Sequence, residues 1–207
     1  MNLLHVISSM DPSFGGLSQA IRNLVSPLNK LGIHSEVVSL DSPTAAFLNS
    51  DSFPIHAIGP WKGPWWYSAT LVPWLMSNFN RFDAVIVHGL WLYHSYGTVK
   101  AFNRFKNLNN NSNKNTKPPR LFIMPHGMLD PYFQRASERK LKAIRNWLYW
   151  KIIESKVVNS ADGLLFTCEA ELLLAREPFN SYFPKREINV GLGIQEPPAF
   201  GPAMRDE

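Results

Sequence analysis

Residues 3–16 read Leu3-Leu4-His5-Val6-Ile7-Ser8-Ser9-Met10-Asp11-Pro12-Ser13-Phe14-Gly15-Gly16. The apolar run at the start is typical of a strand buried on both faces of a parallel sheet, and the polar residues after it predict a turn. Beyond the glycine pair, apolar residues at positions 17, 20, 21, 24, 25, 28 and 31 fall on one face of a helix, which Gly32 is placed to end. With a second strand predicted at 36–40, the chain begins with a βαβ unit of right-handed crossover.

Strand and helix patterns alternate along the rest of the chain. An asparagine-rich stretch at 108–117 predicts a loop. Alternation over the whole length is characteristic of α/β proteins, so we predict a doubly wound, mostly parallel, Rossmann-like sheet. The expected strands lie at 55–58, 83–88, 120–124, 163–167 and 188–190, and the expected helices at 68–79, 92–105, 137–156 and 169–176.

The composition narrows the class of protein. The 207 residues suffice for one generous domain, and 45% hydrophobic with 18% charged residues describe a globular chain. The single cysteine, Cys168, excludes an internal disulfide and a cysteine-based metal cage, which fits a reducing cytoplasm. The first residues lack the features of a signal peptide, and no apolar window of about 18 residues predicts a membrane span. We therefore expect a cytoplasmic protein.

The net charge of +5 is concentrated in one segment. Residues 135–156 hold seven Lys and Arg residues against two Glu, which suggests one anionic surface or ligand. Apolar residues at 141, 144, 147, 148 and 152 share one side of the predicted helix. That pattern suits docking on an anionic membrane, and it suits equally a packed helix with a solvated basic face. The basic residues we single out are Arg139, Lys140, Lys142 and Arg145.

Ligands of such sheets bind beyond the carboxyl ends of the strands. Four segments are expected there, at 11–16, 88–91, 125–131 and 191–194. Gly15 and Gly16, directly before a helix, would let backbone N–H groups approach an anion, although a plain tight turn explains them too. Their spacing matches neither the dinucleotide fingerprint nor the P-loop.

Two histidines, His88 and His126, each follow an apolar strand and precede a glycine. A histidine there can bind a hydroxyl, assist proton transfer or stabilise charge, or it can bond a loop carbonyl as a structural residue. His5 lies inside a strand and is interpreted as a core residue. A further cluster, of aromatic residues, suits either sugar stacking or a small capping core; its members are Trp61, Trp65, Trp66, Tyr67 and Trp74.

Five motifs, taken in order, resemble the bacterial group 1 glycosyltransferases of the GT4 family. Each is weak alone, but the ordered set runs from end to end of the chain. They are Leu4–Gly16 followed by Ser18-Gln19-Ala20, His88-Gly89-Leu90-Trp91, Pro125-His126-Gly127-Met128-Leu129-Asp130-Pro131, Thr167-Cys168-Glu169-Ala170-Glu171 and Gly191-Leu192-Gly193-Ile194.

The resemblance implies an enzyme of two Rossmann-like domains, the GT-B architecture, which moves a sugar from a nucleotide donor with retention and without an obligatory metal or other cofactor. Residues 1–194 would be the acceptor-side domain, and 195–207 the start of a linker to a donor-binding domain. Gly15 and Gly16 would approach the donor diphosphate, and His126 would be catalytic. The acceptor, a glycan or lipid-linked sugar of polysaccharide synthesis, would be bound by His88, Trp91, Gly127 and Met128.

The sequence departs from the family at Leu17, where a proline commonly follows the glycines. Glu169 and Glu177 have the E-x7-E spacing of the second domain but lack its context, so we interpret them as a coincidence. A stand-alone carbohydrate- or membrane-binding module remains an alternative. A nicotinamide oxidoreductase is disfavoured, because Asp41 is a poor ribose ligand and the glycine spacing is absent. Non-specific DNA binding stays open for any basic patch, but we expect no nucleic-acid partner.

Overall fold

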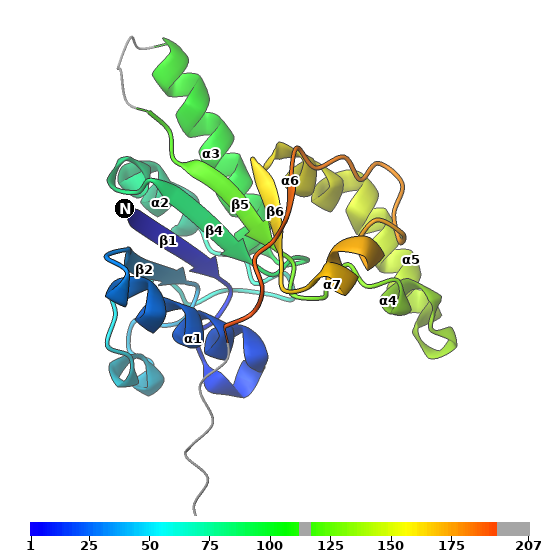
Figure 1. Ribbon diagram of the computed structural model, residues 1–207, viewed down its shortest axis with the longest axis horizontal. Helices are drawn as coiled ribbons and strands as arrows, with labels where there is room; N and C mark the ends of the chain where they lie inside the picture. Colours follow the sequence, from blue (N-terminus) through cyan, green and yellow to red (C-terminus); the bar gives the residue numbers. More distant parts are fainter. Residues whose placement is uncertain (112–116, 194–207) are drawn as a thin grey trace, which may run out of the picture.

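The computed structural model describes residues 1–111 and 117–193, and the expected linker at 195–207 lies outside them. The described chain forms one parallel sheet of seven strands in the order β3-β2-β1-β4-β5-β6-β7 (Figure 1). Each strand runs parallel to its neighbours, which confirms the predicted doubly wound Rossmann-like fold. The strands are β1 (Asn2–Ile7), β2 (His34–Ser39), β3 (Ile55–Ala57), β4 (Ala84–His88), β5 (Arg120–Met124), β6 (Gly163–Phe166) and β7 (Glu187–Asn189).

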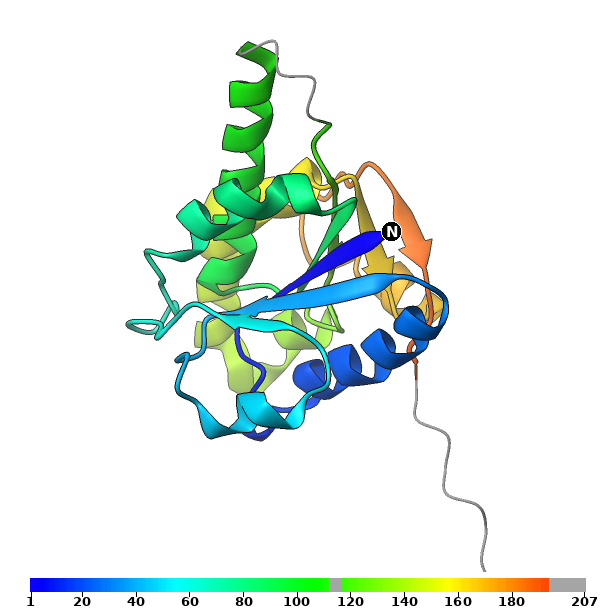
Figure 2. The same cartoon turned by 90° about the vertical axis from the view of Figure 1, so that its left-hand side faces the viewer.

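Helices cover the sheet from both sides. Helix α1 packs on one face, and α2 and α3 pack together on the other (Figure 2). The helices are α1 (Gly16–Lys30), α2 (Leu71–Asn78), α3 (Tyr93–Asn111), α4 (Tyr132–Arg135), α5 (Lys140–Tyr149), α6 (Ser155–Ser160) and α7 (Glu169–Leu174). Short 3-10 turns lie at Pro12–Phe14, Ala46–Ser50, Phe79–Arg81 and Ser137–Arg139.

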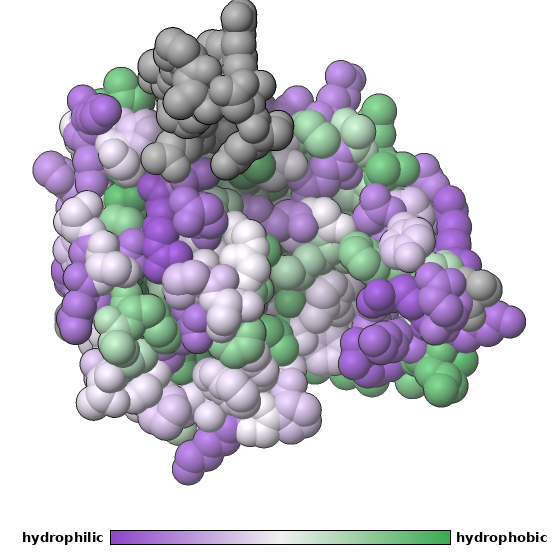
Figure 3. Space-filling model, turned by 90° about the horizontal axis from the view of Figure 1, so that it is seen from below, coloured by the Kyte–Doolittle hydropathy of each residue, from purple (hydrophilic) through white to green (hydrophobic). Residues whose placement is uncertain are grey.

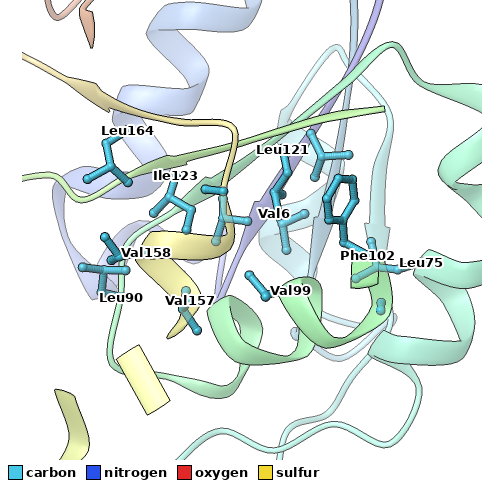
Figure 4. Packing of buried hydrophobic residues seen from close by; sticks show 14 of the residues in the cluster. Val6, Leu75, Leu90, Val99, Phe102, Leu121, Ile123, Val157, Val158 and Leu164 are labelled. Atoms are coloured by element: carbon cyan, nitrogen blue, oxygen red, sulfur yellow. The ribbon is translucent and has the colours of Figure 1, made fainter. Parts of the chain in front are cut away.

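The main core lies between the sheet and the α2, α3 and α6 layer (Figure 4). Val6 of β1 and Leu121 of β5 meet Phe102 of α3 there, all at most 1% exposed. A smaller cluster, built on Ile21 and Val25, joins α1 to the opposite face. The continuous apolar runs of the central strands are therefore explained by burial on both faces.

Two helices differ from the prediction. Helix α3 continues to Asn111, so the loop expected at 108–117 is wrong for residues 108–111, and residues 112–116 lie outside the described part. The single helix expected at 137–156 is divided by a π-helical segment at Trp150–Glu154. Both Trp150 and Glu154 of that segment are buried.

Within the described ranges, no helix is long and apolar enough to cross a membrane. Helix α1 ends as expected, because Gly32 adopts a φ of 75° that favours glycine.

Candidate functional site

The order in which strands are added to the sheet reverses between β1 and β4. These two strands are neighbours although β2 and β3 lie between them in the sequence. The connections after these strands diverge, so an open crevice forms at their carboxyl ends. A cavity of about 470 Å³ lies at this edge. Its lining combines the start of α1, the loop after β5 and the start of α7: Gly16, Leu17, Ala20, His126, Gly127, Asp130, Thr167, Cys168, Ala170, Glu171, Leu174 and Leu192.

The glycine turn forms one wall of the cavity. Asp11 caps the preceding turn by accepting a 2.8 Å hydrogen bond from the Ser13 N–H. Gly15 has φ 103° and ψ −159°, a conformation essentially restricted to glycine. Gly16 begins α1, and a Cβ on either glycine would meet no atom within 4 Å. No described side chain caps the first turn of α1, so its N–H groups remain available to an anion.

Asp41 holds this turn against the sheet. Its carboxylate accepts hydrogen bonds from Ser9 Oγ at 2.6 Å and from the Met10 N–H at 2.8 Å. Asp41 is buried, and both of its oxygens are engaged. The carboxylate that would have been the ribose ligand of a dinucleotide fold therefore anchors the glycine turn instead.

His126 lines the cavity. It has a φ of 53° and is followed by Gly127 with a φ of 76°, so the chain turns sharply after β5. Its Nε2 lies 2.9 Å from Nδ1 of His88. Burial lowers the pKa of His126, and the charge of the nearby Glu171 opposes that shift. The ring is therefore mostly neutral near neutral pH.

Glu171 of α7 ties together the loops that follow β5 and β6. Its carboxylate accepts hydrogen bonds from the Gly127 N–H at 2.7 Å, the Thr167 N–H at 2.7 Å and Thr167 Oγ1 at 2.6 Å. Glu171 lies in one of the five motifs but is not among the predicted site residues. The signal was present, because Cys168 caps α7 and a glutamate three residues later is the spacing of a capping box.

The four predicted acceptor residues are not brought together in the cavity. Gly127 lines it. His88 is only 1% exposed and lies behind His126, and the Met128 sulfur accepts a hydrogen bond from the Leu90 N–H. Trp91 packs away from the cavity, against Tyr149, Trp150 and Phe179. Acceptor binding by these residues stays a prediction, and in this cavity only the position of Gly127 supports it.

The aromatic cluster serves largely as a capping core. Trp61 and Trp66 stack with ring centroids 4.4 Å apart, and the Trp65 ring N–H donates to the Tyr149 hydroxyl. Four of the five predicted members, the tryptophans, are partly buried against the main core. The aromatic cluster contacts the glycine turn through Trp66, because the ring centroids of Phe14 and Trp66 lie 5.0 Å apart. The Phe14 side chain is itself 60% exposed.

The basic segment projects from the body as α4 and α5 (Figure 1). The apolar side chains of its one-sided pattern are exposed: Leu141, Ile144, Trp147, Leu148 and Ile152 are between 47% and 84% accessible. Within the described chain, this side of the helix is therefore not packed against the core. Hydrophilic side chains gather beside hydrophobic ones on this projection (Figure 3). Of the four singled-out cations, Lys140, Lys142 and Arg145 are exposed, while Arg139 lies 5.0 Å over the Phe133 ring.

The two glutamates with E-x7-E spacing, Glu169 and Glu177, do not line the cavity. Glu177 forms a 2.8 Å ion pair with Arg135, at the base of the projection, and Glu169 is exposed.

The chain matches a known protein family. Residues 15–190 match the family described as glycosyl transferase 4-like domain. The chain belongs to this family. The expected relationship to the glycosyltransferases is thus confirmed, and it applies to the part of the chain that contains the cavity. No curated protein matches the chain by sequence.

Two solved structures of HepE share the fold of this chain. HepE from Anabaena in complex with UDP has 14% identity and a TM-score of 0.53 over 91% of this chain and 44% of that chain. HepE with UDP and glucose gives 13% identity and the same TM-score, 0.53, over 90% and 44%. MurG from Acinetobacter baumannii has 13% identity and a TM-score of 0.46 over 92% and 44%. The chain thus spans less than half the length of these proteins.

Proposed function

We propose that this domain is the acceptor-side half of a retaining glycosyltransferase that moves a sugar from a nucleotide donor to a glycan or lipid-linked acceptor in polysaccharide synthesis. The observation that carries the proposal is the cavity at the switch point, where the open N-terminus of α1 faces the loop of His126. The family match and the UDP-bound HepE structures support a nucleotide-sugar donor.

In the proposed reaction, the glycine turn and the His126 loop on either side of the cavity have different roles. The bond between the anomeric carbon and the donor phosphate oxygen breaks, and the acceptor oxygen bonds to that carbon while its proton leaves with the nucleoside diphosphate. The N–H groups at Gly15 and Gly16 would stabilise the diphosphate, and His126 would contact the reacting sugar. We propose no obligatory metal, since backbone donors and the helix dipole act on the same charge.

A donor screen tests the proposal. We expect a protein containing this domain and the donor-binding domain implied by the family to transfer sugar from one nucleotide donor, with the anomeric configuration unchanged by proton NMR. The 207-residue chain alone should show negligible turnover, because transfer requires both substrates in one closed site. A product of inverted configuration, or rapid transfer by the 207-residue chain alone, contradicts this part of the proposal. If no donor is used, the alternative of a binding module gains support.

We propose further that the protein acts at the cytoplasmic face of a membrane, with the α5 projection lying on anionic lipid. Its exposed apolar side chains and adjacent lysines support this placement. Vesicles of phosphatidylglycerol should bind the chain more tightly than vesicles of phosphatidylcholine. The double variant Leu141→Ser and Ile144→Ser should abolish that binding, whereas Leu31→Ser, at an exposed residue on another surface, should not. Equal binding by both variants argues against the placement.

A further inference from the structure

Three imidazole rings form a continuous chain from the sheet to the cavity. His5 Nδ1 lies 2.9 Å from His88 Nε2, and His88 Nδ1 lies 2.9 Å from His126 Nε2. The ring centroids are 5.2 Å apart at both steps. His5 and His88 are essentially inaccessible, and His126 lines the cavity. The interpretation of His5 as an ordinary core residue therefore missed what its ring contacts.

The parallel sheet produces this alignment. In the register of β1 and β4, His5 lies opposite Ile86, two residues before His88 on the same face of the sheet. His88 in turn lies opposite Met124, two residues before His126. His94 of α3 donates a 2.8 Å hydrogen bond to the carbonyl of His88 and so holds the end of β4. Two of the three rings are therefore placed by strands of the sheet, and His126 follows the end of a third strand.

The chain constrains the atoms that His126 offers to a ligand. Its Nε2 is engaged by His88, so Nδ1 is the ring nitrogen left for the cavity. A neutral imidazole carries one proton, and the middle ring must donate on one side and accept on the other. Two proton arrangements satisfy both hydrogen bonds, one with His126 protonated at Nδ1 and one with it protonated at Nε2.

Two observations favour protonation at Nδ1. In the opposite arrangement, His5 Nε2 would carry a proton, and this buried atom has no partner among the described residues. An orphaned buried N–H is rare in proteins. In the favoured arrangement every ring N–H points from His5 toward His126, so the positive end of the dipole chain is at His126, the ring that feels the negative charge of Glu171. Burial lowers the pKa of all three rings, to about 4 for His5, which keeps the chain neutral near neutral pH.

We infer that His88, supported by His5, is a positioning residue that holds His126 as the neutral Nδ1–H tautomer, so that His126 presents a hydrogen-bond donor to an oxygen of the ligand in the cavity. The inference deepens the proposed function, on which it rests for the nature of that ligand. A donor phosphate oxygen or a sugar hydroxyl fits an N–H donor. His126 then orients or stabilises an oxygen and does not act as the base that removes a proton.

The test is the tautomer of His126, observed in the 15N-labelled 207-residue chain. Two-bond proton–nitrogen correlation spectra distinguish the two neutral forms, and the His126→Asn variant assigns the signals. We expect His126 to give the pattern of protonated Nδ1 and unprotonated Nε2. The reverse pattern, or a doubly protonated ring near neutral pH, overturns the inference.

Variants of His88 separate positioning from simple structure. His88→Asn keeps an amide donor near the place of Nδ1 and should preserve the His126 pattern, whereas His88→Leu should give the other tautomer or a mixture. His34→Asn, at an exposed histidine, is the matched control and should change nothing. An unaltered His126 pattern in His88→Leu overturns the inference, and the wild-type spectrum decides alone if that variant does not fold.

These spectra need no sugar transfer, so the two proposals can fail separately. Nδ1 protonation together with undiminished transfer by His126→Ala would support the positioning chain and remove the proposed role of His126 in the reaction.

Discussion

Gly15 and Gly16 differ in what the absence of a side chain achieves. Gly15 is required by its backbone, because φ 103° with ψ −159° is strained for any other residue. Gly16 has an ordinary helical conformation and open space beside it, so its backbone does not demand glycine. What Gly16 provides is access to the first turn of α1 from the cavity.

Substitution by alanine should therefore separate the two roles. Gly15→Ala should lower the free energy of unfolding by about 1–3 kcal/mol because of backbone strain. Gly16→Ala should leave it unchanged or raise it by up to about 1 kcal/mol, since alanine favours the helix. In a protein with both domains, Gly16→Ala should raise the KM for the nucleotide sugar about tenfold, a loss of about 1.4 kcal/mol. An unchanged KM would indicate that the donor does not approach this turn.

At the scale of elements, the π-helical segment links the α5 projection to the loop after β4. It directs Glu154 inward, where Oε1 accepts a 2.6 Å hydrogen bond from the Trp91 N–H and a 3.0 Å bond from Ser95 Oγ. Trp91 has a φ of 70°, which is unusual for a bulky residue. The Glu154 carboxylate therefore stabilises a strained turn at the carboxyl end of β4.

Glu154→Ala should destabilise the chain by about 2 kcal/mol, because it leaves the Trp91 N–H without an acceptor. The Ser95 hydroxyl keeps the Leu92 carbonyl as a partner. Glu154→Gln keeps an acceptor oxygen and should cost less. Urea unfolding of the two variants measures the difference. Equal losses would contradict this role of Glu154, because glutamine keeps both the side-chain volume and an acceptor oxygen.

Element positions were largely predictable, because the strands are continuous apolar runs and α1 has a clear helical period. Two features were not. The one-sided apolar pattern at 141–152 has the same period whether that side is buried or exposed, so only the structure shows it exposed. Within the site, Gly16, His126 and Gly127 follow strands and were predicted, whereas the bonds of Glu171 to two separate loops depend on tertiary packing.

For the whole molecule, buried titratable groups determine the pH dependence of stability. Burial lowers the pKa of His5 and of His94 to about 4 and depresses that of His88, so the unfolded chain binds more protons at these sites below about pH 6.5. Burial raises the pKa of Glu154 to about 7, which makes the folded state bind the extra proton between about pH 4.5 and 7. The protons that the unfolded chain gains at three histidines outnumber the one that the folded chain gains at Glu154, so stability falls on acidification.

The free energy of unfolding should therefore fall as the pH is lowered from about 6.5 to 5.5, by roughly 2 kcal/mol from these groups. Glu154→Gln removes the opposing contribution and should steepen the fall by about 1 kcal/mol per pH unit. Urea titrations at several pH values measure both slopes. A stability that rises on acidification would contradict the neutral, buried state of the histidines.

We propose His126 as the side chain at the reacting centre, and its place in the lining of the cavity supports that proposal. The most direct measurement is kcat for sugar transfer by a protein that contains this domain and its donor-binding partner domain, compared among the wild type, His126→Ala and the exposed-site control His34→Ala. We expect His126→Ala to lower kcat about tenfold or more while the protein still folds, because the variant lacks a hydrogen-bond donor to the reacting ligand. We expect wild-type kcat for His34→Ala. Equal kcat values for His126→Ala and the wild type would contradict the assignment of this cavity as the transfer site.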